Sequence, residues 1–272
     1  MKKNKEKHIN KDLKEHISQN KKVFTIYVVL RISVILVMIA QFFNGNYENV
    51  FMCLLTLFLF TIPSFVEEKF RIDIPDTLEI IILLFIYSAE ILGEIQAFYI
   101  KFPYWDTMLH TINGFLAAAI GFSMVDLLNR HEKFTFKLSP LFMAIVGFCF
   151  SMTIGVLWEF FELGMDIIFN TDMQKDTVIS SISTVMLNPN GLNVPIKIKD
   201  ITSVIINGQE LGLNGYLDIG LYDTMKDLFV NFIGAVVFSV IGYFYVKKRG
   251  NGNVAKKFIP IVIEDNTKAD LE

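Results

Sequence analysis

The most constraining feature of this 272-residue chain is a series of long apolar runs separated by short polar segments. Crossing about 30 Å of hydrocarbon takes about 20 apolar residues in a helix. Because the bilayer interior offers no partners to backbone polar groups, each run must satisfy its own as a helix. We therefore predict an all-α, polytopic transmembrane bundle of about six spans, at residues 23–43, 50–66, 78–99, 107–128, 140–169 and 222–246.

Composition supports a membrane protein and excludes some other classes. The chain is 53% hydrophobic with a mean hydropathy of +0.45, and its charged residues cluster between the apolar runs. No basic patch interleaves with aromatic residues, so we expect the lipid bilayer and no nucleic acid as partner. Cys53 and Cys149 both lie within apolar runs, and we expect no disulfide. The oligomeric state stays open.

The distribution of cationic residues predicts the orientation, because Lys-rich and Arg-rich loops stay in the cytoplasm. One set of loops and termini holds nineteen Lys and Arg, and the opposite set holds four. Both termini are then cytoplasmic. The predicted segments are a cytoplasmic N-terminal segment at 1–22, helices one to five within 23–169, an extracytoplasmic cap at 170–221, a sixth helix at 222–246 and a cytoplasmic tail at 247–272.

The long connection 170–221 carries a signal of its own. Between Val194 and Leu213, β-branched residues form two runs around Asn207-Gly208, a dipeptide typical of two-residue hairpin turns. We expect a small hairpin-containing cap there. The tail after Gly250 is expected to be a mobile cytoplasmic segment.

Acidic residues inside the apolar runs are the informative exceptions. Each costs about 2.5–3.5 kcal/mol at mid-membrane on insertion scales and therefore needs a partner or a function. Their spacing places the members of each set on one helix face. The four sets are Glu90 and Glu94; Trp105, Asp106 and His110; Trp158, Glu159, Glu162 and Asp166; and Asp223, Asp227 and Asn231.

With the predicted orientation, all four sets fall in one layer below the outer surface. The third and fifth helices end there, and the fourth and sixth begin there. Eight carboxylates in this layer have only Lys101 and Lys226 nearby. They cannot all be ionised and unpaired, so some are protonated or a cation is present.

Simpler interpretations stay open for several of these residues. Asp106 and Asp223 stand at helix starts, where a carboxylate caps free N–H groups. Asp166 can be solvated, and Trp105 and Trp158 suit the aromatic belt at a membrane interface.

Carboxylates and an imidazole delivered by several helices are typical of metal sites in helical bundles. These ligand types suit Zn²⁺, Mn²⁺ or Mg²⁺. In this hypothesis His110, Glu159, Glu162 and Asp227 are ligands, and Asp106 or Asp223 orients His110 or acts as general base on a metal-bound water. The reaction would be hydrolysis or group transfer on a lipid-linked or envelope substrate. These six residues are the candidate catalytic residues.

Two alternatives belong to other classes. In a proton- or cation-coupled transporter, Glu90, Glu94, Glu159 and Glu162 would titrate during transport. That reading needs a water path to both sides, and the cytoplasmic half offers little beyond Arg31 to line one. The third alternative is a non-catalytic membrane protein whose buried acids only pair helices.

Three motifs resemble a known family. They are residues 98–110 followed by Gly114; residues 157–162 with Asp166 and 171–174; and residues 223–228 with Asn231 and 234–235. Together they resemble the YjdF-type inner-membrane proteins over residues 78–246. A looser similarity to VanZ-like proteins lacks the Arg of their third motif. The resemblance implies an integral protein of the bacterial cytoplasmic membrane, of unestablished biochemical function. It singles out the same polar residues, supplies no reaction and implies no role for residues 175–221.

Overall fold

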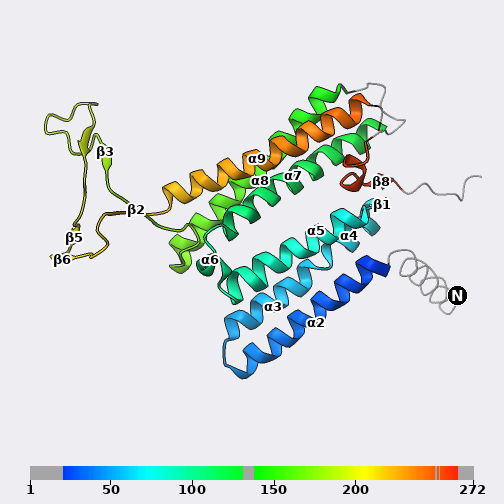
Figure 1. Cartoon of the computed structure of the whole chain (residues 1–272), viewed down its shortest axis with the longest axis horizontal. Coiled ribbons are helices and arrows are strands. Elements are labelled where there is room, and N and C mark those ends of the chain that lie inside the picture. Colours follow the sequence, from blue (N-terminus) through cyan, green and yellow to red (C-terminus); the bar gives the residue numbers. More distant parts are fainter. Residues whose placement is uncertain (1–20, 131–137, 249, 251, 263–272) are drawn as a thin grey trace, which may run out of the picture. The chain divides into compact units, whose positions relative to one another are not determined.

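The computed structural model describes residues 21–130, 138–248, 250 and 252–262. Most of the predicted segment 1–22 and the end of the predicted tail therefore lie outside the described residues. Contact density divides the chain into two compact units, residues 1–152 with 231–272, and residues 153–230. Figure 1 labels the helices and strands of both units.

The described part of the chain is mostly helical, as predicted. Five helices are long and apolar enough to cross a membrane. They are α2 (Lys21–Phe43), the pair α3 (Tyr47–Leu59) and α4 (Ile62–Phe70), α7 (Trp105–Arg130), α8 (Pro140–Phe169) and α9 (Leu221–Lys247). Four of them agree closely with predicted spans, since the end of each apolar run also ends its helix. The second predicted span is interrupted after Leu59 and resumes as α4, with Pro63 in the first turn of that helix.

The remaining predicted span, 78–99, is helical but irregular. It consists of α5 (Asp76–Tyr87), which continues directly into a π-helical segment, η1 (Ser88–Ile95). A π-helix has i→i+5 hydrogen bonds and is often found at functional sites. A short helix, α6 (Phe98–Lys101), follows after Ala97, which adopts a left-handed backbone conformation with φ of 57°.

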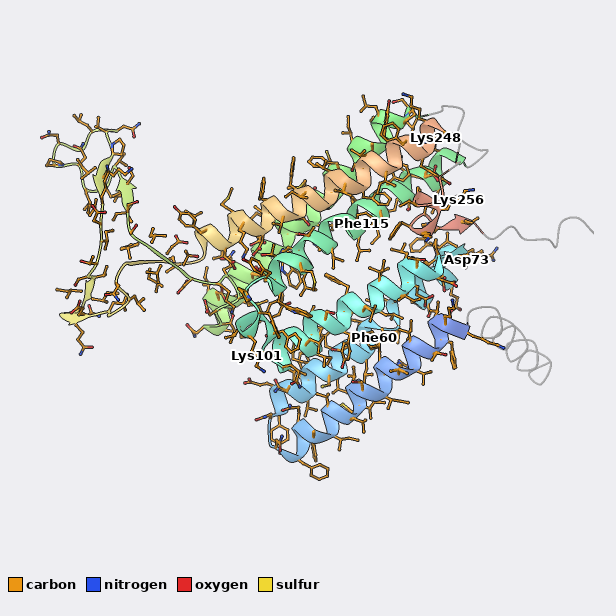
Figure 2. All side chains as sticks on the ribbon, viewed as in Figure 1. Phe60, Asp73, Lys101, Phe115, Lys248 and Lys256 are labelled. Carbon is orange, nitrogen blue, oxygen red and sulfur yellow. The ribbon has the colours of Figure 1, made fainter. Side chains whose placement is uncertain are left out.

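The described part of the first unit has three apolar clusters, one of them around Leu78 and Leu116. Another joins α2, α3, α5 and η1 around residues such as Val34, Phe60 and Leu83, which are almost completely buried (Figure 2). The third joins α7, α8 and α9 around Phe122, Met143 and Phe238. Because the lipid-facing sides of such helices are also apolar, packing and not hydrophobicity decides which face is buried.

The tail after Gly250 packs into the first unit, so the expectation of a mobile segment was wrong for its described part. A 3-10 turn, η2 (Ala255–Lys257), precedes β8 (Ile261–Val262), which pairs antiparallel with β1 (Ile72–Asp73). Phe258 lies with its ring centroid 4.9 Å from that of Phe115 on α7. The apolar tail residues anchor this segment on the helices.

The second unit contains the C-terminal part of α8, the first part of α9 and three small antiparallel ladders between them. The ladders pair β2 (Thr177–Ile179) with β7 (Tyr216–Asp218), β3 (Ile182–Thr184) with β4 (Ile196–Ile198), and β5 (Ile205–Ile206) with β6 (Gln209–Glu210). Asn207 and Gly208 link β5 and β6 with φ of 51° and 82°. Two positive φ values characterise the type I′ turn, and the predicted hairpin is confirmed.

Candidate functional site

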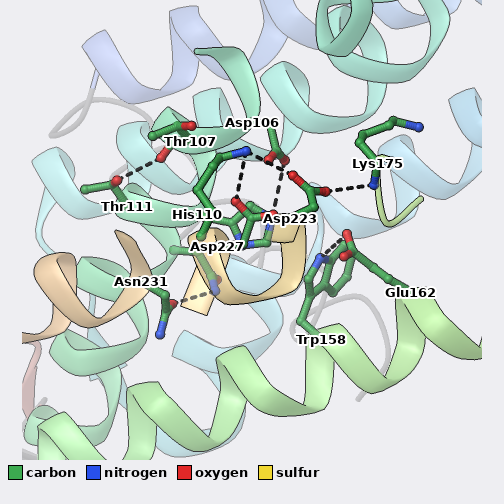
Figure 3. A network of polar contacts seen from close by, with 12 residues as sticks. Asp106, Thr107, His110, Thr111, Trp158, Glu162, Lys175, Asp223, Asp227 and Asn231 are labelled. Atoms are coloured by element: carbon green, nitrogen blue, oxygen red, sulfur yellow. Dashed lines mark hydrogen bonds and ion pairs between the residues drawn. The ribbon is translucent and has the colours of Figure 1, made fainter. Parts of the chain in front are cut away.

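Two site residues predicted from the sequence pair on the first turns of α7. His110 Nε2 lies 3.4 Å from Asp106 Oδ1, and His110 is buried (Figure 3). The i,i+4 spacing places both side chains on one helix face. Trp105, at the start of the same helix, donates its indole N–H to the carbonyl of Ser88 in η1 at 3.3 Å. Trp105 thus ties α7 to the π-helical segment.

Directly after this pair, amide side chains connect α7, α8 and α9. Asn113 Nδ2 donates to Asn231 Oδ1 at 3.3 Å (Figure 3), and Asn231 Nδ2 donates to the carbonyl of Ser151 at 3.4 Å. The Ser151 hydroxyl donates to the carbonyl of Gly114 at 2.8 Å. Asn231 is 1% exposed. Interhelical hydrogen bonds of this kind hold membrane helices in register.

Small residues let α7 and α9 approach closely. A Cβ atom added at Gly114 would lie 2.1 Å from the backbone oxygen of Asn231, and one added at Gly234 would lie 2.1 Å from that of Thr111. Further along, a Cβ at Gly242 would meet the Phe122 ring. From the Gly114–Asn231 contact to the Phe122–Gly242 contact both helices advance in the same direction, so they run parallel in the first unit. Only glycine fits these contact points.

The layer beyond the amide network is apolar and tightly packed. Ala118, Ala119, Phe122, Ala235 and Phe238 are all fully buried. The rings of Phe122 and Phe238 stack edge to face with centroids 5.9 Å apart. Phe238 also contacts the Phe115 ring, at 5.1 Å between centroids. This apolar layer separates the polar network from the Arg130 end of α7.

In the second unit, the acidic residues of α9 are paired with a lysine. Lys226 Nζ lies 3.0 Å from Asp223 Oδ1 and 3.7 Å from Asp227 Oδ1. Asp223 also accepts a hydrogen bond from the backbone N–H of Lys175 at 2.8 Å (Figure 3). Asp218 accepts the backbone N–H of Tyr222 near the helix start. Asp223, in the first turn of α9, therefore also holds the loop that contains Lys175.

A short strap after α8 organises this region. The Asp166 carboxylate accepts backbone N–H groups of Met173 and Gln174 at 2.6 and 2.9 Å, and the Thr171 hydroxyl at 2.8 Å. The Gln174 side chain then donates to the Thr224 hydroxyl at 2.7 Å. Asp166 thus has a structural role in the fold, in place of the merely solvated position that the sequence left open.

The two predicted glutamates of α8 are buried. Glu162 accepts the indole N–H of Trp158 at 2.8 Å (Figure 3), and the backbone carbonyl of Glu159 accepts the Gln174 amide at 3.4 Å. Glu159 is 4% exposed and Glu162 is 7% exposed. The Trp158 indole thus donates a hydrogen bond to a buried carboxylate, in addition to the place in the aromatic belt that the sequence left open for it. The ligand roles predicted for these two glutamates stay predictions.

Within the first unit, Asp106 and His110 are placed so that both could bind one metal ion, with His110 Nε2 3.4 Å from Asp106 Oδ1. His110 is buried, and Asp106 is partly buried. His110 belongs to the predicted ligand set. Asp106 was predicted beside it, as an orienting residue or general base. Asp227, another predicted ligand, belongs to the second unit and is 1% exposed.

Two predicted site residues lie on another element, and three polar residues were missed. Glu90 and Glu94 lie on η1, a π-helix that the sequence pattern did not reveal. Asn113 and Ser151 were missed, although Asn113 follows His110 by one turn on the same face. Asp126, buried at 4% exposure in α7, was also missed. A lone acid within a predicted span was the available signal for it.

Comparison with known proteins gives one match. The model of a family described as predicted membrane protein (DUF2238) matches residues 26–248. This is the family to which the YjdF-type motifs of the sequence belong. No curated protein and no solved structure gives a significant match.

Proposed function

The chain belongs to the DUF2238 family of predicted membrane proteins, and from that premise we propose a divalent-metal centre as its functional site. The proposed ligands are Asp106, His110 and Asp227. The proposed activity is metal-dependent hydrolysis or group transfer on a lipid-linked or envelope substrate. Carboxylate and imidazole ligands suit Zn²⁺ and Mn²⁺, and with more water ligands Mg²⁺.

The observation that carries the proposal is the spacing of the ligand atoms. Two atoms bound at about 2.0–2.2 Å to a tetrahedral metal lie about 3.4 Å apart. His110 Nε2 and Asp106 Oδ1 are 3.4 Å apart, as two ligand atoms of one metal ion would be. Asp227, buried at 1% exposure, is the proposed third ligand. Three protein ligands would leave a fourth position for water or substrate, as in catalytic zinc sites.

The neighbouring acids have distinct roles in the proposal. Asp223, held by the Lys175 N–H and the Lys226 ammonium, serves as general base toward a metal-bound water. Lys226 neutralises Asp223 and Asp227 while no ion is bound. Glu159 and Glu162 supply further negative charge that favours a cation.

The apolar layer favours an enzyme over the alternative of a proton- or cation-coupled transporter. Transport needs a polar path to both membrane faces, whereas Phe122 and Phe238 stack in a fully buried layer directly beyond Asn231. Ser123, Asp126 and Ser239 are buried on the far side of it. Within the described residues, the polar groups thus form two separate sets.

We further propose that the chain lies in the bacterial cytoplasmic membrane with both termini inside, which places this site near the outer face. The support is the excess of Lys and Arg in one set of loops. A lipid-linked substrate would then enter from the outer leaflet.

Elemental analysis of the purified protein tests the metal proposal. After incubation with Zn²⁺, Mn²⁺ or Mg²⁺ and desalting, the wild type should retain about one ion per chain. His110→Ala and Asp227→Asn should lose it, because each removes a ligand. Glu159→Gln and Glu162→Gln test the larger ligand set, and Glu210→Gln in the β5–β6 hairpin is the control. Absence of all three metals from the wild type would sink the proposal.

Flux measurements test the transporter alternative independently. In proteoliposomes we expect no movement of protons or Zn²⁺ above that of empty vesicles. Flux that disappears in Glu90→Gln or Glu159→Gln would establish the transporter in place of the enzyme.

A further inference from the structure

An apolar crevice lies between α5–η1 and α7, on helices of the first unit. It has a volume of about 210 Å³ and is lined by Ile81, Leu84, Phe85, Ser88, Met108, Leu109 and Ile112. Apart from Ser88 the lining side chains are all apolar. The crevice is smaller than the about 300–1,000 Å³ of pockets that enclose a whole drug-sized ligand. It therefore suits part of an extended molecule.

The crevice is continuous with the surface that faces the lipid. Two of its lining residues, Leu84 and Met108, are 44% and 39% exposed and form its open rim. Met108 lies on α7, a helix long and apolar enough to cross a membrane, and Leu84 lies in the span predicted at 78–99. In a bilayer the solvent around both would be acyl chain. What enters such an opening sideways is therefore hydrocarbon.

Packed residues border both ends of the crevice. At one end the indole of Trp105 bonds to the Ser88 carbonyl, and the rings of Phe98 and Trp105 stack with centroids 4.9 Å apart. At the other end Leu78 and Leu116 are buried in one apolar cluster. Aromatic residues with a polar tip commonly lie at the level of lipid head groups. The Trp105 end is therefore the end at which a head group would lie.

The crevice occupies the same stretch of α7 as the proposed metal ligands. Met108 and Leu109 line it, while Asp106 and His110 flank them in the sequence and lie on another face of the helix. Since α7 begins at Trp105 and Asp106 is the next residue, the Trp105 end of the crevice lies at the same helical turn as Asp106. A head group passing over this turn would reach the carboxylate.

We propose that this crevice binds an acyl chain of the lipid substrate, holding its head group beside Asp106 and His110. The inference rests on the proposed function and narrows its substrate class to lipids that carry an acyl chain. Burial of the acyl chain supplies affinity that does not depend on the head group. The polar residues then determine which head group is recognised.

Photo-crosslinking of the full chain in nanodiscs tests this inference. The probe is phosphatidylglycerol with a diazirine in one acyl chain, and labelled peptides are identified by mass spectrometry. Labelling should concentrate on residues 81–88 and 108–112. Leu84→Trp should fill the rim and reduce this labelling about tenfold, equivalent to 1.4 kcal/mol of binding. Leu54→Trp, at a 52% exposed leucine of α3, is the matched control and should leave it unchanged.

A second probe, with the diazirine in the head group, should label the first turns of α7. Labelling spread evenly over lipid-exposed residues, or undiminished in Leu84→Trp, would overturn the crevice proposal. Zinc content is measured on the same samples. Crevice labelling without bound metal would leave the lipid site standing and remove the metal centre, so the two failures are distinguishable.

Discussion

At the scale of single residues, buried polar groups of this protein are placed by hydrogen bonds to neighbouring helices and loops. Asn231 shows this most clearly, because it accepts from Asn113 and donates to the Ser151 carbonyl while 1% exposed. Asp166 likewise accepts three hydrogen bonds from the strap that follows its helix. Such groups are costly to leave unsatisfied away from water.

Replacing Asn231 should therefore destabilise the protein. Asn231→Ala removes both interhelical hydrogen bonds, and we expect the free energy of unfolding to fall by about 1–2 kcal/mol. Denaturation in mixed detergent micelles measures it. Val237→Ala, at a half-exposed position of the same helix, should change it by less than about 0.5 kcal/mol. Equal effects of the two substitutions would contradict the structural role of the amide.

At the scale of elements, the contact between α7 and α9 depends on residues without side chains. The backbones meet at Gly114 and Gly234, where an added Cβ would lie 2.1 Å from a backbone oxygen of the other helix. A flexible neighbour could yield to such a Cβ, but a helix backbone cannot move without displacing the whole helix. The amide network and His110 lie on the same faces of these helices.

We expect Gly234→Ala to separate the helices and lower the free energy of unfolding by about 1–3 kcal/mol, the cost of overpacking. Gly164→Ala in α8 is the control, because nothing lies within 4 Å of its added Cβ. There the better helix propensity of alanine should stabilise the protein by up to about 1 kcal/mol. The same sign of change in both variants would show that close packing is not what Gly234 provides.

At the scale of the whole molecule, the described tail completes the apolar clusters of the first unit. Phe258 contacts the rings of Phe115 and Phe238, at 4.9 and 6.4 Å between centroids. Ile259 beside it is 3% exposed. The tail therefore contributes to stability although it follows the last span.

Phe258→Ala should lower the free energy of unfolding by about 2–3 kcal/mol, because it removes a packed aromatic side chain. The measurement is again denaturation in detergent micelles. Val254→Ala, at a 56% exposed position of the same tail, should have little effect. An unchanged stability of Phe258→Ala would mean that the tail is dispensable to the core.

The proposed orientation also belongs to the whole molecule. In a background of Cys53→Ala and Cys149→Ala, a membrane-impermeant maleimide added to intact cells should label Asn190→Cys in the 170–221 segment. Lys248→Cys should react only after lysis, because the loops and termini rich in Lys and Arg stay inside. The reverse pattern would invert the topology and place the candidate site near the cytoplasmic face.

The helical architecture could be predicted from the amino-acid sequence alone, because the length of an apolar run is a local property that decides whether the run can span a bilayer. The same holds for the hairpin at Asn207-Gly208, whose turn geometry is set by two residues. The sequence also singled out His110 and Asp227, since a polar residue in an apolar run is visible without coordinates. Which of these side chains meet partners on other segments depended on the tertiary structure. The π-helical turn at Glu90, the anchoring of Asp223 by the Lys175 N–H and the packing of Phe258 all depend on contacts between distant segments. Such contacts leave no periodic trace in the chain, because they are set by how the helices pack.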